Sequence, residues 1–164
     1  LAQAGLIRKN GAQLDWRAMV VPAGGSCSII LRNNSDHATK EKVLQITREL
    51  AENDGIEQVF YRRQIDSLGG DPNAVVMFEA KPGYAFGGEM TGDLVTPASS
   101  KSTHGYLPTK PDMLAGFIAA GPRIAQAGNI GRMRSVDLFA TIAEIFGVEV
   151  ERKDTRIVHK MFAH

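Results

Sequence analysis

Apolar residues near the start of the chain fall into short runs rather than into a helical stripe. Two β-prone runs, 16–21 (WRAMVV) and 27–31 (CSIIL), are separated by the segment 22–25 (PAGG). Short β-prone runs joined by a glycine-bearing loop are typical of an antiparallel hairpin. The pattern therefore predicts a hairpin over 16–31.

A helical periodicity replaces these runs over 39–53. Val43, Ile46 and Leu50 recur at i, i+3 and i+7, while the charged residues between them face away. This spacing predicts an amphipathic helix with one buried face and one solvated face. The candidate caps for its start are Ser35, Asp36 and Thr39.

Two further β-prone runs come after the predicted helix, at 58–62 (QVFYR) and 74–80 (AVVMFEA). Strand, helix and strand over this distance favour an α/β or α+β arrangement in which helices pack on a sheet. The predicted fold class is therefore α/β.

The second half of the chain begins with a long irregular segment, 81–105, which is rich in glycine, proline and serine. Long segments of this kind inside compact domains are often functional. The continuous apolar run 114–120 then predicts a buried strand of the parallel type. A last helix is predicted over 136–146, with Ser135 as its N-cap and Gly147 as its stop. It is apolar almost all round, so we expect it to be buried between layers.

Length, composition and charge describe an ordinary globular protein. The chain has 164 residues, of which 43% are apolar and 23% charged, and a net charge of +1. This length suits one domain, 1–164, with a sizeable core. The charge gives no electrostatic footprint for nucleic acid or for an anionic membrane surface. No apolar run reaches the ~18 residues that a membrane span needs.

Cys27 and the first seven residues are both explained by local structure, without a catalytic or binding role. Cys27 is the only cysteine, which excludes an intrachain disulfide, and its apolar surroundings favour a small strand residue. The start of the chain, 1–7 (LAQAGLI), resembles the end of a helix with Gly5 at its C-terminal cap. A chain that begins inside an element is expected to be a piece of a longer protein.

The candidate metal ligands are the four histidines, His37, His104, His159 and His164. No HExxH or HxH spacing joins them, so no metal-binding helix is predicted. Asp36-His37 precedes the first predicted helix, where a capping turn is the simpler explanation. His104 ends the irregular segment and lies beside a glycine, so it could present a neutral imidazole to a metal ion. The alternative is a loop histidine that donates to a backbone carbonyl.

Three blocks carry a resemblance to a known family: 80–86 (AKPGYAF), 103–122 (THGYLPTKPDMLAGFIAAGP) and 136–148 (VDLFATIAEIFGV). In this order they resemble the type I phosphodiesterase/nucleotide pyrophosphatase family of the alkaline phosphatase superfamily. Ala140 stands where that family usually has proline. The stretches 5–7 and 25–30 resemble the segment that comes after the family's Asp-His-Gly motif.

The resemblance implies the C-terminal part of an alkaline phosphatase-like three-layer α/β/α sandwich, with a small α+β excursion at 16–78. It implies that His104 is a ligand of one zinc in a two-zinc site. The nucleophile and the other metal ligands are expected upstream of Leu1, so no catalytic residue is assigned in this chain. The expected partners are a small phosphate ester and the missing N-terminal part of the same domain. Periplasmic or extracellular proteins are common in the family, but the sequence assigns no compartment.

Two other functions remain open. The chain could be a non-catalytic binding or interaction domain that shares the fold. It could also belong to a sulfatase, phosphonate hydrolase or phosphomutase of the same superfamily, since a shared fold does not identify the substrate. In each enzyme case we expect the 164-residue chain alone to be inactive, because one imidazole binds zinc weakly.

Overall fold

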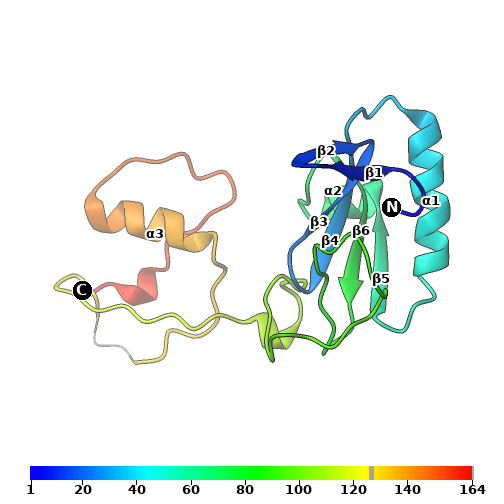
Figure 1. Cartoon of the computed structure of the whole chain (residues 1–164). Helices are drawn as coiled ribbons and strands as arrows, with labels where there is room; N and C mark the ends of the chain where they lie inside the picture. Colours follow the sequence, from blue (N-terminus) through cyan, green and yellow to red (C-terminus); the bar gives the residue numbers. More distant parts are fainter. Residues whose placement is uncertain (126–127, 164) are drawn as a thin grey trace. The chain divides into compact units, whose positions relative to one another are not determined.

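The computed structural model describes residues 1–125 and 128–163, which form two compact units, Leu1–Leu114 and Ala115–His164. Figure 1 labels the helices and strands along the chain. The described residues make up a mixed α/β protein with two antiparallel sheets. This agrees with the predicted class at that coarse level.

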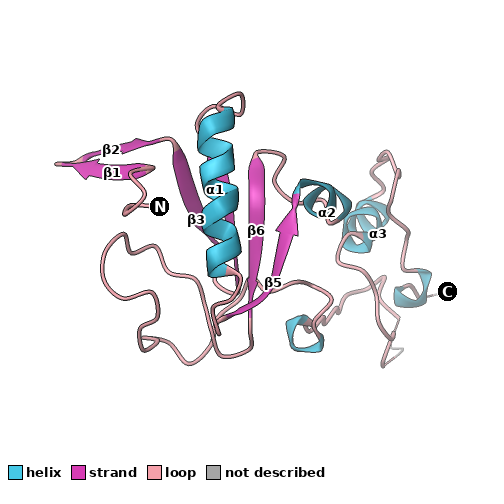
Figure 2. Ribbon diagram, turned by 90° about the vertical axis from the view of Figure 1, so that its right-hand side faces the viewer, coloured by secondary structure: helices cyan, strands magenta, loops and turns pink. Residues whose placement is uncertain are grey.

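The strands of the described chain belong to the first unit. A small sheet pairs β1 with β2, and a larger antiparallel sheet has the order β3-β4-β6-β5. Figure 2 shows α1 lying across one face of the larger sheet, and α2 directly after β5. The bounds are β1 Ile7–Asn10, β2 Gln13–Trp16, β3 Ala18–Pro22, β4 Ser26–Leu31, α1 His37–Leu50, β5 Ile56–Tyr61, α2 Arg62–Ser67 and β6 Ala74–Ala80.

The core of the first unit lies between α1 and the larger sheet. Alternate residues of β4 are buried, as a strand with one covered face requires. Ile29 from β4 and Val76 from β6 meet Val43 from α1 in one cluster. Each such side chain contributes about 1.5–3 kcal/mol through its removal from water. The sequence periodicity that predicted these elements is thus the pattern that builds the core.

The structure confirms, with small shifts of their ends, the hairpin predicted over 16–31, the helix over 39–53 and the strands at 58–62 and 74–80. β3 and β4 pair antiparallel from Ala18↔Leu31 to Pro22↔Cys27. The start of α1 is capped by Asp36, whose side chain accepts hydrogen bonds from the backbone N–H of Thr39 at 2.9 Å and from its hydroxyl at 2.6 Å. The Asp36-His37 pair is therefore a capping turn.

Cys27 lies buried in β4, as expected for a small strand residue. Burial raises the pKa of its thiol to about 12. A thiol with such a pKa stays protonated near neutral pH, which disfavours nucleophilic chemistry at this position.

The turn at the start of the chain adopts the hydrogen-bond pair that closes helices. The N–H of Gly5 donates to the carbonyl of Ala2 at 2.9 Å, and that of Leu6 donates to the carbonyl of Leu1 at 3.0 Å. Gly5 has a positive φ of 68°, as a Schellman-type cap requires. Gly5 therefore has the predicted cap geometry, but residues 2–5 form a turn and not the predicted end of a helix.

The second unit consists of α3 (Asp137–Phe146), the 3₁₀ turn η2 (His159–Met161) and connecting segments. The backbone N–H of Ala125 donates to the carbonyl of Met161, and that of Ala163 donates to the carbonyl of Arg123, so residues 123–125 are joined to residues 161–163. The last segment is also tied to α3, because the N–H of Val158 donates to the Thr141 hydroxyl at 3.0 Å. Gly147 ends α3 in the left-handed conformation, as predicted.

Two expectations for this half of the chain are wrong. The run 114–120 forms no strand, and it is exposed: Leu114 is 57% and Ile118 95% accessible. A strand needs a pairing neighbour, and among the described residues none pairs with this run. Likewise α3 is not buried all round, since Phe146 is 77% accessible. Its N-cap position falls on Val136 rather than on Ser135.

The sequence contains no membrane-length apolar run, and the described helices agree with that: none is both long enough and apolar enough to span a bilayer.

Acid should weaken the second unit through Asp137. Its carboxylate accepts from the Arg134 guanidinium at 2.6 Å and from the backbone N–H of Arg156 at 2.9 Å. These hydrogen bonds, with that of Arg134 the larger, lower the pKa of Asp137 from 3.8 to about 2. The stabilisation is therefore complete above the unfolded pKa and is lost as pH falls through the folded value.

We predict that Asp137→Asn destabilises α3 at neutral pH and that this deficit shrinks as pH falls from 3.8 toward 2. The α3 amide signals in NMR spectra, followed during acid titration, measure it. Glu144→Gln, at an exposed carboxylate 3.6 Å from Arg152, is the matched control. An equal deficit for Asp137→Asn at every pH would contradict this account.

Candidate functional site

His104 lies in the first unit, on irregular chain that is held against the sheet. The residue is exposed, while its backbone carbonyl accepts a hydrogen bond from the N–H of Gly25 at 2.7 Å. Gly25 belongs to the loop between β3 and β4. A segment distant in sequence is thus fixed to the hairpin through the histidine's own peptide, and the exposed imidazole stays accessible to a ligand.

Three glycines allow the two backbones to approach this closely. A Cβ at Gly24 would overlap the carbonyl oxygen of His104, and a Cβ at Gly105 would overlap the carbonyl oxygen of Ala23. A Cβ at Gly25 would overlap the ring of Tyr106. No other residue type fits at these contacts without moving the chain. We call this contact between residues 22–25 and 103–106 the glycine interlock.

The hairpin side of the glycine interlock is itself anchored to β6 and to the segment after it. Ala80 donates its N–H to the carbonyl of Gly25 at 2.8 Å, and Phe86 donates its N–H to the carbonyl of Gly24 at 2.7 Å. The Tyr106 hydroxyl donates to the carbonyl of Tyr84. Segments 80–86 and 103–106, separated by a long irregular stretch, therefore meet around one loop.

A buried carboxylate, paired with a half-buried ammonium, lies next to the glycine interlock. Glu79, at 1% exposure, accepts the backbone N–H of Leu107 at 2.9 Å through Oε1. The same oxygen lies 3.2 Å from the ammonium of Lys110, which also contacts Glu57 at 2.6 Å. That ammonium stands 5.0 Å from the centre of the Tyr106 ring, within cation–π range.

The charge of Lys110 is maintained despite partial burial. Desolvation acts against the charged form, but hydrogen bonds to Glu57 and Glu79 outweigh it and raise the pKa of Lys110. Lys110 is thus a fixed cation beside the buried carboxylate.

Sequence reasoning missed Glu79 and Lys110. The available signal was a single acid inside the apolar run 74–80 (AVVMFEA), which predicts a buried and paired charge. Its partner could not be identified from spacing, because Lys110 comes to it through tertiary structure.

The predicted metal role of His104 is not accompanied by a complete set of ligands in the part of the chain that is described. Residues 1–125 and 128–163 contain no group of three His, Cys, Asp or Glu residues that could hold a metal ion. A zinc site needs three or four preorganised ligands. These residues therefore supply one candidate donor and not a complete zinc site. His164 lies outside the described residues.

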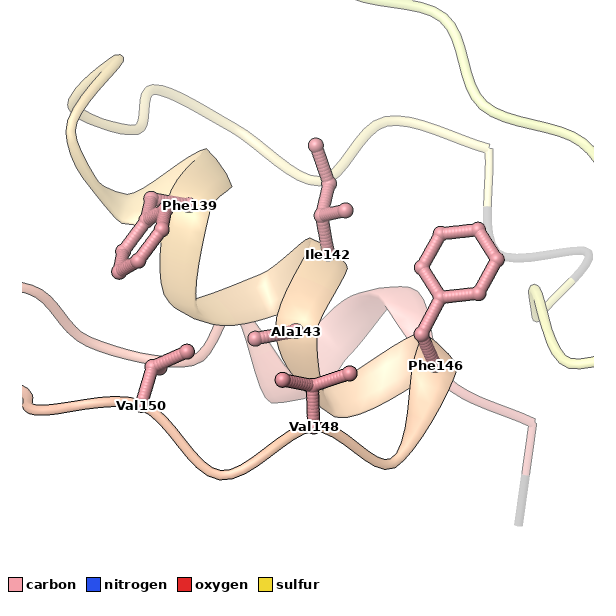
Figure 3. A pocket seen from close by; sticks show the side chains of 6 residues that line it. All are labelled: Phe139, Ile142, Ala143, Phe146, Val148 and Val150. Carbon is pink, nitrogen blue, oxygen red and sulfur yellow. The ribbon is translucent and has the colours of Figure 1, made fainter.

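An apolar hollow of about 280 Å³ lies on α3 of the second unit (Figure 3). It is lined only by apolar side chains: Phe139, Ile142, Ala143, Phe146, Val148 and Val150. A hollow without polar groups offers nothing to orient a polar substrate or to move a proton. It can only receive apolar groups.

Comparisons with models of protein families, with curated proteins and with solved structures gave no match to this chain.

The glycine interlock predicts how much stability is lost when Gly105 is replaced by alanine, and Gly83, which lies outside the interlock, is the matched control. Both have positive φ, 81° and 89°, but a Cβ at Gly83 would meet nothing within 4 Å. Alanine at either position carries a backbone strain of ~1–2 kcal/mol. Only Gly105→Ala also forces the interlock apart, which adds ~1–3 kcal/mol.

Urea unfolding of the two variants measures the difference. We expect Gly105→Ala to lose clearly more stability than Gly83→Ala. Equal losses would mean that the close contact with Ala23 does not persist in solution.

Proposed function

We propose that the chain is the C-terminal portion of a metal-dependent phosphodiesterase or nucleotide pyrophosphatase of the alkaline phosphatase superfamily. In this proposal, residues 1–164 are a partial alkaline phosphatase-like α/β/α sandwich domain, and 16–78 form a small α+β excursion within it. His104 is a ligand of one of two zinc ions. The substrate class is a small phosphate diester or pyrophosphate.

The observation that carries the proposal is the meeting of two motif blocks in space. Segments 80–86 and 103–106 both resemble the family, and both are hydrogen-bonded to the loop 22–25. A resemblance spread over distant segments gains weight when those segments form one structure. It is also at this structure that the imidazole of His104 is exposed on a fixed backbone.

Zinc, when bound, would polarise a phosphoryl oxygen and lower the pKa of bound water. In this proposal, the chain itself contributes one positioned zinc ligand. The fixed peptide of His104 limits where its imidazole can lie, and preorganisation of a ligand lowers the entropy lost on binding. Among the described residues no group of three His, Cys, Asp or Glu residues could hold a metal ion. A single imidazole binds zinc weakly, so we expect no hydrolysis by this chain alone.

Exposed apolar surface supports a part of a larger domain over a self-contained interaction module. Ile118 and Phe146 are 95% and 77% accessible, and Phe139 and Val148 beside Phe146 are also exposed. Apolar clusters of this kind normally face another part of the protein or a partner. The alternative, a non-catalytic binding domain, would use the same surface for a partner. Sulfatase, phosphonate hydrolase and phosphomutase activities remain further alternatives, since the proposal identifies no substrate-selecting residue in this chain.

The test of the proposal on this chain combines zinc content with an esterase assay. We expect the purified chain to bind zinc weakly and substoichiometrically, with the imidazole of His104 responding in NMR spectra, and to show no turnover of bis-p-nitrophenyl phosphate. Weak binding is expected because one imidazole replaces the three or four ligands of a complete site.

His104→Ala should remove that response, whereas His159→Ala should retain it. Tight stoichiometric zinc with turnover would contradict the proposal, because the chain would then be a complete enzyme. An unresponsive His104 at millimolar zinc would also count against it.

A further inference from the structure

Glu79 is the one carboxylate that β6 carries into the interior beside the glycine interlock. It is 1% exposed, and it sits next to Ala80, whose N–H is bonded to Gly25. A buried carboxylate is strongly unfavourable unless hydrogen bonds and an opposite charge compensate it. The contacts of Glu79 must therefore compensate the cost of burying its carboxylate.

Its contacts are concentrated on one oxygen. Oε1 accepts the N–H of Leu107 at 2.9 Å and lies 3.2 Å from the ammonium of Lys110. Oε2 has no hydrogen-bond partner among the described residues. Hydrogen bonds from a backbone N–H to a carboxylate are shorter and stronger than those to a neutral acceptor. The Glu79 carboxylate thus binds residues of the segment after His104 and not residues of its own strand.

Leu107 and His104 are three positions apart, and both are held by their backbones. The carbonyl of His104 is bonded to Gly25 on one side, and the N–H of Leu107 is bonded to Glu79 on the other. Tyr106, between them, is fixed through its hydroxyl to the carbonyl of Tyr84. The segment is consequently bound at one end to the β3–β4 loop and at the other end to β6.

We propose that Glu79 is a positioning residue: with Lys110 it clamps residues 104–107 to the sheet and so fixes the backbone that presents the His104 imidazole. The clamp itself depends only on the contacts above. Its consequence for metal binding rests on the proposed function.

A merely stabilising ion pair would behave differently. Loss of such a pair would lower the stability of the whole first unit and would raise the exchange of all its amides together. Loss of a clamp opens the segment locally, so its own amides exchange faster than those of the sheet. Amide hydrogen exchange therefore distinguishes the two roles.

The experiment compares Glu79→Ala, Glu79→Gln and the matched control Glu57→Gln in the full 164-residue chain by NMR hydrogen exchange. Glu57 is the other carboxylate on Lys110 and is not bonded to Leu107. In Glu79→Ala we expect the amides of Leu107 and Gly25 to exchange at least ~10-fold faster relative to the amides of β4 and β6, which corresponds to about 1.4 kcal/mol of local opening.

Glu79→Gln keeps a side-chain oxygen for Leu107 but loses the charge, so we expect a smaller acceleration than in Glu79→Ala. Glu57→Gln should leave the exchange of Leu107 unchanged. Parallel acceleration of sheet and segment amides, or no change at Leu107, overturns the proposal. If Glu79→Ala does not fold, Glu79→Gln and Glu57→Gln are compared instead. For each variant we take the exchange rate of the Leu107 and Gly25 amides divided by that of the β4 and β6 amides. Equal values in the two variants overturn the proposal.

The zinc response of His104 is a separate readout. A change confined to the amides of Leu107 and Gly25 supports the clamp whatever zinc does. Absence of a zinc response at His104 counts against the proposed function alone.

Discussion

The site depends on the close approach of two backbones, the hairpin loop 22–25 and the segment 103–106. A hydrogen bond from Gly25 to the carbonyl of His104 joins them, and the absent side chains of Gly24 and Gly105 make room for it. Backbone contacts of this kind tolerate no added Cβ. Because β4 carries the loop and also forms the centre of the core, the position of His104 depends on the packing of the sheet.

The charged pair of Glu79 and Lys110 adds a second constraint to the same segment. A long irregular chain has little packing of its own, so a few strong contacts must order it. The carboxylate holds the N–H of Leu107, and the ammonium covers the ring of Tyr106. The segment is therefore ordered by contacts to the sheet and not by secondary structure, and this is why the sequence around His104 combines glycines with isolated charges.

Local patterns predicted the first unit well, because each of its elements has its own periodicity and cap. The helix start at Asp36 is one example, since a cap is a contact between near neighbours. Predictions failed where structure depends on distant partners. The apolar run 114–120 matches a buried strand in composition, but composition does not provide a neighbouring strand. The metal role of His104, which its place beside a glycine and the resemblance both suggested, stays a prediction. The pairing of Glu79 was missed because its partner Lys110 comes from a remote segment.

The proposed function requires that this chain continues, on its N-terminal side, a two-zinc hydrolase to which His104 contributes one ligand. Sequencing the coding region upstream of the Leu1 codon tests this requirement most directly. We predict a continuous reading frame that encodes a Thr or Ser nucleophile, then an Asp-x-x-x-His pair and an Asp-His-Gly motif. A continuous frame without these motifs, or an in-frame stop codon immediately upstream, would contradict the proposed function.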